Sequence, residues 1–138
     1  LDGLKAEIGS SYFKALIDAA HCGDSGLSLP ENEALIAEYG EQDFIGPFHC
    51  SAPTTRGCLS TDDGWIGALL AANARTGKLP SAFVELFMHD DPALEPLRTL
   101  VPGHGIDTTG GRSYTELMVD GLVDTVRRLN NFKARGVV

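Results

Sequence analysis

The sequence predicts a mainly α fold: a single compact domain over residues 1–138, with five or six helices and two long irregular loops. Apolar residues recur at three- and four-residue intervals in several segments, which is the spacing of one face of a helix. Two of these segments begin with a capping box, which is a helix-start signal. No tight-turn sequence joins alternating runs, so nothing indicates a β-hairpin. With 43% hydrophobic residues, the chain can bury one core.

The first helix is expected between residues 4 and 20. Its apolar stripe consists of Leu4, Ile8, Tyr12, Leu16 and Ala19. The Gly9-Ser10-Ser11 segment is expected to interrupt this helix. Gly23 and Gly26 are expected to end it, because glycine is a frequent helix terminator.

The clearest helix signal lies at residues 29–39, where Ser28 and Glu31 have capping-box spacing and Pro30 falls in the first turn. Residues 41–60, by contrast, show no helical stripe. The Gly46-Pro47 pair in this segment would interrupt a strand, because proline cannot donate a ladder hydrogen bond. We therefore predict a structured loop at 41–60, with at most a short strand.

The second half of the chain is predicted to hold the remaining helices. One begins at Thr61-Asp62-Asp63, because acidic residues favour a helix N-terminus, and ends at Gly77. Short helices are expected at 82–88 and 92–100. The last helix follows a second capping box at Ser113 and Glu116, and its predicted buried stripe consists of Met118, Leu122, Val126 and Leu129.

The net charge of −8 and the pI of about 4.8 limit the partners of the protein. Nucleic acids and anionic membrane surfaces require a basic surface, so we predict neither as a partner. The longest apolar run, residues 66–72, is too short to span a bilayer. A small polar or anionic ligand and a protein partner remain open, and the sequence assigns no compartment.

The segment His-Cys-Ser-Ala-Pro-Thr-Thr-Arg at residues 49–56 carries the strongest chemical pattern. Cys50 and Arg56 have the Cys-x5-Arg spacing that resembles the motif of the cysteine-dependent phosphatases. The resemblance implies a loop whose N–H groups bind an oxyanion, with Arg56 as a bidentate ligand and Cys50 as the nucleophile. His49 is the candidate base. The resemblance covers eight of the 138 residues, and Pro53 stands where the loop needs an N–H donor.

The loop at residues 102–113 is the second candidate for a binding site. Gly110 and Gly111 would let the backbone approach a ligand closely, at the start of a helix. Arg112 adds a positive charge there, and His104 is a candidate acid or base near neutral pH. The alternative is a capped helix that follows a turn.

The three cysteines allow other interpretations. Cys22 and Cys50 with a histidine would suit zinc by ligand type, but no close Cys-x2–4-Cys pair is present, so we predict no metal and no cofactor. A disulfide is the stronger alternative: either Cys50 pairs with Cys58, or Cys22 pairs with one of them. Such a bridge would tie down the 41–60 loop.

From the sequence we expect a polar cleft built by the two loops and a hydrolase that acts on an anionic or polar substrate. Cys50 is then the nucleophile, and His49 or His104 is the base. One alternative is a non-catalytic interaction or accessory domain with a disulfide-stapled loop. Another is a lysozyme-like glycan hydrolase, with Glu7, Glu31 and Glu41 as candidate carboxyls by position alone.

Overall fold

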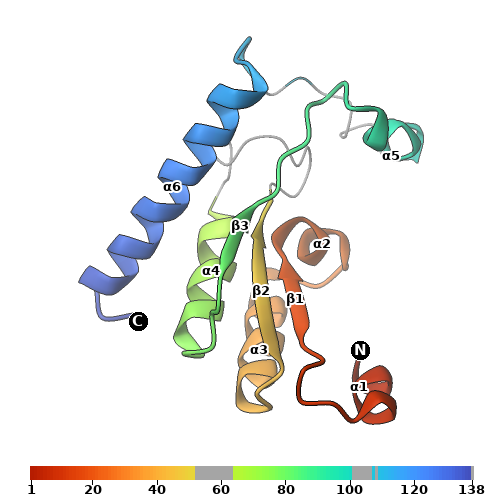
Figure 1. Ribbon diagram of the computed structural model, residues 1–138, viewed down its shortest axis with the longest axis vertical. Helices are drawn as coiled ribbons and strands as arrows, with labels where there is room; N and C mark the ends of the chain where they lie inside the picture. The colour runs from red at the N-terminus through yellow and green to blue at the C-terminus, as the bar shows by residue number, and fades with distance from the viewer. Residues whose placement is uncertain (52–63, 101–106, 108, 138) are drawn as a thin grey trace.

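The fold is mixed α/β, built on a three-stranded parallel sheet in the order β1-β2-β3 (Figure 1). The structure is a computed structural model that describes residues 1–51, 64–100, 107 and 109–137. The strands are β1 (Ala15–Asp18), β2 (Ile45–Cys50) and β3 (Ala82–Val84). The helices are α1 (Asp2–Ile8), α2 (Ala19–Asp24), α3 (Leu29–Glu41), α4 (Trp65–Arg75), the short 3-10 helix η2 (Pro92–Leu94), α5 (Glu95–Leu100) and α6 (Tyr114–Ala134). The prediction of a mainly α fold is therefore wrong.

Helices α3 and α4 lie side by side and cover one face of the sheet (Figure 1). The chain crosses from β1 to β2 through α2 and α3, and from β2 to β3 through α4. Both crossovers step in the same direction across the sheet. Crossovers of one hand that step in one direction place their helices on the same face.

The main core lies between this face of the sheet and the two helices. Ile17, Phe48 and Cys50 point into it from the strands, and Ile36 and Leu69 point into it from α3 and α4. The opposite face is different: Leu16 is 48% exposed and Phe83 is 52% exposed. Parallel sheets usually have both faces covered. Here the described residues leave much of one face open.

The N-terminal segment is the first place where the prediction fails. Leu4, Ile8, Tyr12 and Leu16, the residues of the predicted buried stripe, are all about half or more exposed. Helix α1 ends at Gly9, which has a φ of 61°. The next regular element is β1, in which Ala15 and Ile17 are buried and Leu16 is not. The two-residue period of β1 was not recognised in the sequence, because the apolar residues up to Leu16 also recur every four residues, as they would on one face of a helix.

The second failure concerns β2, which runs through Gly46 and Pro47 and is the central strand. The register with β1 shifts between Ala15 and Ile17. Ala15 pairs with Ile45 and Ile17 pairs with Phe48, so the bulge is in β2 and contains Gly46 and Pro47. A bulge is one of the positions where a strand tolerates proline. Gly46 is also required for space, since a Cβ there would lie 2.8 Å from the carbonyl oxygen of Ala15.

The third failure is the segment 82–88, which was expected to be a helix. Its first three residues form β3, paired in parallel with β2, and Phe83 lies opposite His49. A strand of three residues is too short to show a period of its own, so pattern alone could not separate it from a helix.

The capped helices were predicted correctly. Both capping boxes form, Ser28 with Glu31 at the start of α3 and Ser113 with Glu116 at the start of α6. Asp91 accepts a hydrogen bond from the N–H of Ala93 and so begins η2. Gly40 does not end α3 but lies inside it, where a Cβ would clash with Thr76. None of the helices in the described ranges combines the length and apolarity needed to cross a bilayer.

Two buried asparagines give opposite predictions for stability. The side chain of Asn73 in α4 is fully buried, and within the described part of the chain neither its Nδ2 nor its Oδ1 has a hydrogen-bond partner. The Asn32 amide, also buried, donates to the carbonyl oxygens of Cys22, Leu27 and Ser28. An unsatisfied buried amide costs free energy, whereas a satisfied one does not.

We therefore expect Asn73→Leu to raise the free energy of unfolding by about 1–2 kcal/mol. Asn32→Leu, the matched control, should lower it by about 1–3 kcal/mol, since three backbone carbonyls lose a donor. Urea unfolding followed by circular dichroism measures both values. A destabilised Asn73→Leu variant would show that its amide has a partner after all.

Candidate functional site

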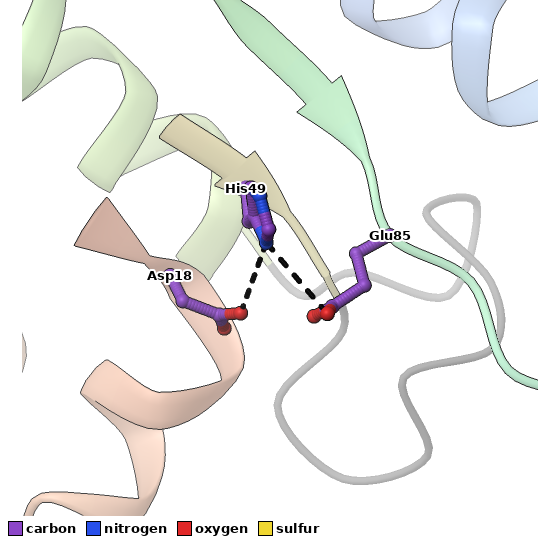
Figure 2. A group of neighbouring side chains, drawn as sticks. All are labelled: Asp18, His49 and Glu85. Atoms are coloured by element: carbon purple, nitrogen blue, oxygen red, sulfur yellow. Dashed lines mark ion pairs between the residues drawn. The ribbon is translucent and has the colours of Figure 1, made fainter. Parts of the chain in front are cut away.

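Three polar side chains meet at the edge of the sheet where the strands end. Asp18 is the last residue of β1, His49 is the penultimate residue of β2, and Glu85 directly follows β3. Asp18 pairs in register with His49, and His49 with Phe83. Because alternate residues of a strand share a face, Glu85 lies on the same face as Phe83 and His49. The three side chains therefore converge on the open face of the sheet (Figure 2).

The imidazole of His49 lies between the two carboxylates (Figure 2). Its Nδ1 is 3.5 Å from Oδ2 of Asp18 and 3.7 Å from Oε1 of Glu85. One ligand atom from each of the three residues lies within 4.8 Å of the others. Both measured distances are longer than an ordinary hydrogen bond.

Asp18 is held in place by the helix that it begins. Its Oδ1 accepts hydrogen bonds from the N–H groups of Ala20, at 2.8 Å, and His21, at 3.1 Å. The residue has extended backbone angles and caps α2, as an N-cap aspartate normally does. Its side chain is 6% exposed. The cap uses Oδ1, and Oδ2 is the oxygen that faces His49.

His49 and Glu85 are positioned by the sheet. The His49 ring packs edge-on against Phe83, with ring centroids 5.9 Å apart. The N–H of Glu85 donates to the carbonyl oxygen of Cys50 at 3.0 Å, which extends the β2–β3 ladder by one residue. Both side chains are about one quarter exposed, so a ligand can reach them from solvent.

The geometry suits a bound cation. Two atoms that each lie about 2.1 Å from one ion are about 3.0–3.4 Å apart in octahedral or tetrahedral coordination. The separations of 3.5 Å and 3.7 Å from His49 need only a small contraction to reach this range, and the two carboxylates lie within 4.8 Å of each other. Two carboxylates and one neutral imidazole are also a chemically normal ligand set for a divalent metal.

A buried hydroxyl lies at the same edge of the sheet. Ser51 follows the last residue of β2, and its side chain is fully buried. Its Oγ has no hydrogen-bond partner among the described residues. Buried hydroxyls normally have a partner, so Ser51 is an exception among the described residues.

Cys50 does not join the cluster, because neighbouring residues of a strand point to opposite faces. It is 1% exposed and packs in the main core, whereas His49 faces the open side. No disulfide joins Cys22 to Cys50, so that predicted bridge is not formed. The predicted bridges to Cys58 lie outside the described residues. The nucleophilic role of Cys50 stays a prediction, and burial in the core makes it harder for a substrate to reach this sulfur.

The predicted binding residues of the second loop have roles within their own turn. Gly110 and Gly111 have φ values of 61° and 80°, which favour glycine. The N–H of Gly111 donates to Oγ1 of Thr109. Arg112 donates to the carbonyl oxygen of Thr109 and pairs with Asp120 of α6. These contacts agree with the alternative of a turn before a capped helix, and substrate binding by this loop stays a prediction.

The remaining predictions fall partly outside the described residues. Arg56, His104 and Cys58 lie there, so the single cleft of two loops is untested. Of the three glutamates named for glycan hydrolysis, Glu31 accepts hydrogen bonds from Ser28 that lower its pKa. A general acid for glycan hydrolysis needs a raised pKa, so the structure gives Glu31 no support in that role.

A surface hollow lies between α3 and α4, and Glu33, Ala37, Gly40 and Thr76 are among its lining residues. Arg75 and Glu33 pair across it at 3.8 Å. This hollow contains a surface ion pair but no histidine, and none of its lining residues belongs to the Asp18–His49–Glu85 cluster. We therefore place the candidate site at the sheet edge.

Sequence reasoning found His49 but missed Asp18 and Glu85. A signal was present, because Ala-Leu-Ile-Asp at 15–18 and Ala-Phe-Val-Glu at 82–85 share a pattern. Each is a short apolar run that ends in an acidic residue. Acidic residues after parallel strands gather at one edge of the sheet, where ligands of α/β proteins bind.

Comparison of the chain with protein-family models, with curated proteins and with solved structures gave no significant match.

Cys22 provides a chemical reporter of the charge on Asp18. Burial, and to a lesser degree the negative charge of Asp18, raises the pKa of the Cys22 thiol to about 11. Only the thiolate reacts with iodoacetamide, so Cys22 should be alkylated slowly near pH 8. Asp18→Asn removes the charge and keeps an oxygen for the cap, so it should lower this pKa and speed the reaction.

Peptide mass spectrometry after timed alkylation measures the rate at each cysteine. Cys50 is the internal control, because it is buried in the core and should not respond to Asp18. Equal acceleration at both cysteines would indicate general unfolding instead of a local charge effect.

Proposed function

We propose that the protein is a divalent-metal-dependent hydrolase that acts on a small polar or anionic substrate. The observation that carries the proposal is the convergence of Asp18, which is buried, with His49 and Glu85, which are partly exposed, at the carboxyl edge of a parallel sheet. This edge is where open α/β sheets bind their ligands.

The ligand set favours a transition metal or zinc. An imidazole nitrogen together with two carboxylate oxygens is suited to Zn²⁺, Mn²⁺ or Fe²⁺, whereas Mg²⁺ and Ca²⁺ prefer oxygen ligands alone. Asp18 would contribute Oδ2, His49 would contribute Nδ1, and Glu85 would contribute a carboxylate oxygen. The cap on α2 and the packing of His49 on Phe83 orient two of these ligands in advance.

Three protein ligands leave coordination positions open for water and substrate, as catalytic sites require. A divalent ion lowers the pKa of bound water toward neutrality and polarises an acyl or phosphoryl oxygen. In hydrolysis the water oxygen bonds to the electrophilic atom and the bond to the leaving group breaks. One proton of the water is released to solvent and the leaving group takes up a proton.

Charge balance supports a polar or anionic substrate. The chain carries a net charge of −8, and the site itself holds two carboxylates. Without an ion, these carboxylates would repel an anion. A divalent ion neutralises them and supplies the positive charge that binds a phosphate or carboxylate group. In this proposal His49 is a metal ligand and not the base for Cys50.

The test is metal binding measured by isothermal titration calorimetry with Zn²⁺ and Mn²⁺. Asp18→Asn, His49→Asn and Glu85→Gln should each weaken binding by about a hundredfold or more, since loss of an outer-shell partner alone costs about 10–100-fold. Glu7→Gln is the control: it removes the same charge from an exposed residue of α1 and should leave the affinity unchanged.

Activity is measured on a panel of phosphate esters, carboxylic esters and amides. We expect hydrolysis that stops after chelation, returns with the metal, and is lost in Glu85→Gln but not in Glu7→Gln. Metal binding without hydrolysis of any substrate on this panel would contradict the proposed reaction but would support the metal site. Hydrolysis that resists chelation but falls in His49→Asn would replace the metal with a His49–Asp18 acid–base pair.

A further inference from the structure

Helix α6 carries an apolar stripe on its outer side. Val119, Leu122, Val123 and Val126 are 54%, 51%, 50% and 56% exposed. Their spacing of three, four and seven residues is that of one helix face. Exposed apolar residues are common singly, but four on one face of a helix form a contiguous surface.

The orientation of this stripe is fixed by the inner side of the same helix. Leu117 packs with Leu86 in a second small core, and Gly121 and Thr125 are buried. Leu129 and Phe132 pack against the main core. Because α6 is attached along both of its halves, it cannot turn its outer stripe inward without losing these contacts.

We propose that this stripe binds the same stripe of a second copy of the protein, with the two α6 helices antiparallel about a two-fold axis between Leu122 and Val123. This proposal does not depend on the metal site. The apolar residues are self-complementary in this arrangement: Val119 faces Val126 of the second copy, and Leu122 lies beside the Leu122 of that copy. Such an isologous contact is the usual basis of a homodimer.

The charges beside the stripe specify both the partner and the direction. At about 100° per residue, Glu116, Asp120 and Arg127 fall on the same flank of the stripe. The two acidic residues lie before its centre and Arg127 lies after it. Antiparallel pairing places Arg127 of one copy next to Glu116 and Asp120 of the other. Parallel pairing about a two-fold axis would instead place Arg127 against the opposite flank of the second helix, away from Glu116 and Asp120.

The intrachain partners leave Arg127 available for this contact. Glu116 caps α6 through Ser113, and Asp120 pairs with Arg112. Arg127 is exposed and makes no ion pair within the described residues. A contact through four apolar residues per copy is small, so we expect a dimer that dissociates on dilution.

The first experiment is sedimentation equilibrium of the intact protein over a concentration series that reaches the high micromolar range. The wild type should pass from monomer to dimer. Arg127→Glu and Asp120→Arg should each weaken dimerisation by about tenfold or more, because like charges then meet across the two-fold axis. Arg135→Glu, at the end of α6 and off the stripe, is the matched control and should change nothing.

Mixing the two variants tests the pairing itself. In a heterodimer of Arg127→Glu with Asp120→Arg, both pairs of residue 120 with residue 127 across the axis are opposite in sign. The equimolar mixture should therefore dimerise more tightly than either variant alone, a result that misfolding cannot produce. A monomeric wild type at every concentration, or no recovery in the mixture, would overturn the proposal and leave a different partner for the stripe.

Cysteine cross-linking then fixes the direction. Residue 122 lies beside the two-fold axis, so the Leu122→Cys variant should form a disulfide between the two copies. Mass spectrometry of the linked peptides identifies it. Val119→Cys should not, because two copies of residue 119 would be about 10 Å apart along antiparallel helices. Efficient cross-linking at both positions would indicate parallel helices and would overturn the antiparallel arrangement.

Discussion

The structure depends on the parallel pairing of three short strands. Parallel strands end at the same edge of a sheet, so residues far apart in the chain meet there without any local motif. Asp18, His49 and Glu85 are brought together in this way, and the register of β1 with β2 places the first two side by side. The same pairing explains why His49 and Cys50, although adjacent in sequence, belong to different parts of the molecule: one faces the candidate site and the other the core.

The direction in which the chain crosses the sheet determines which face is open. Both crossovers step from β1 toward β3, so α3 and α4 cover the same face. A chain that reversed direction would place helices on the other face as well. Because this chain does not, Leu16 and Phe83 remain about half exposed and the carboxylates of the cluster face the uncovered side.

The sequence predicted helices that have local start signals and failed where the determinants were not local. The capping boxes at Ser28 and Ser113 involve residues three apart, and both helices begin where expected. Strand β2 depends instead on a bulge against β1, which accommodates Pro47. Strand β3 depends on its pairing with β2. For the same reason His49 was found within a local motif, whereas Asp18 and Glu85 required knowledge of the sheet. The cluster could be assembled only after the strands were placed.

Helix α6 shows a different limit of periodicity. The sequence correctly predicted an amphipathic helix, but Leu122 and Val126 of the predicted buried stripe lie outside, while Gly121 and Thr125 lie inside. Gly121 and Thr125 are small, and small residues allow a helix to approach its neighbours closely. Helix α6 therefore has one face that packs against its own core and a second apolar face that is exposed. The spacing of apolar residues in α6 shows that the outer face is apolar, but it does not identify what binds there. The sign change of the flanking charges at the middle of the helix adds the missing information, since an antiparallel copy of the same helix places Arg127 beside Glu116 and Asp120.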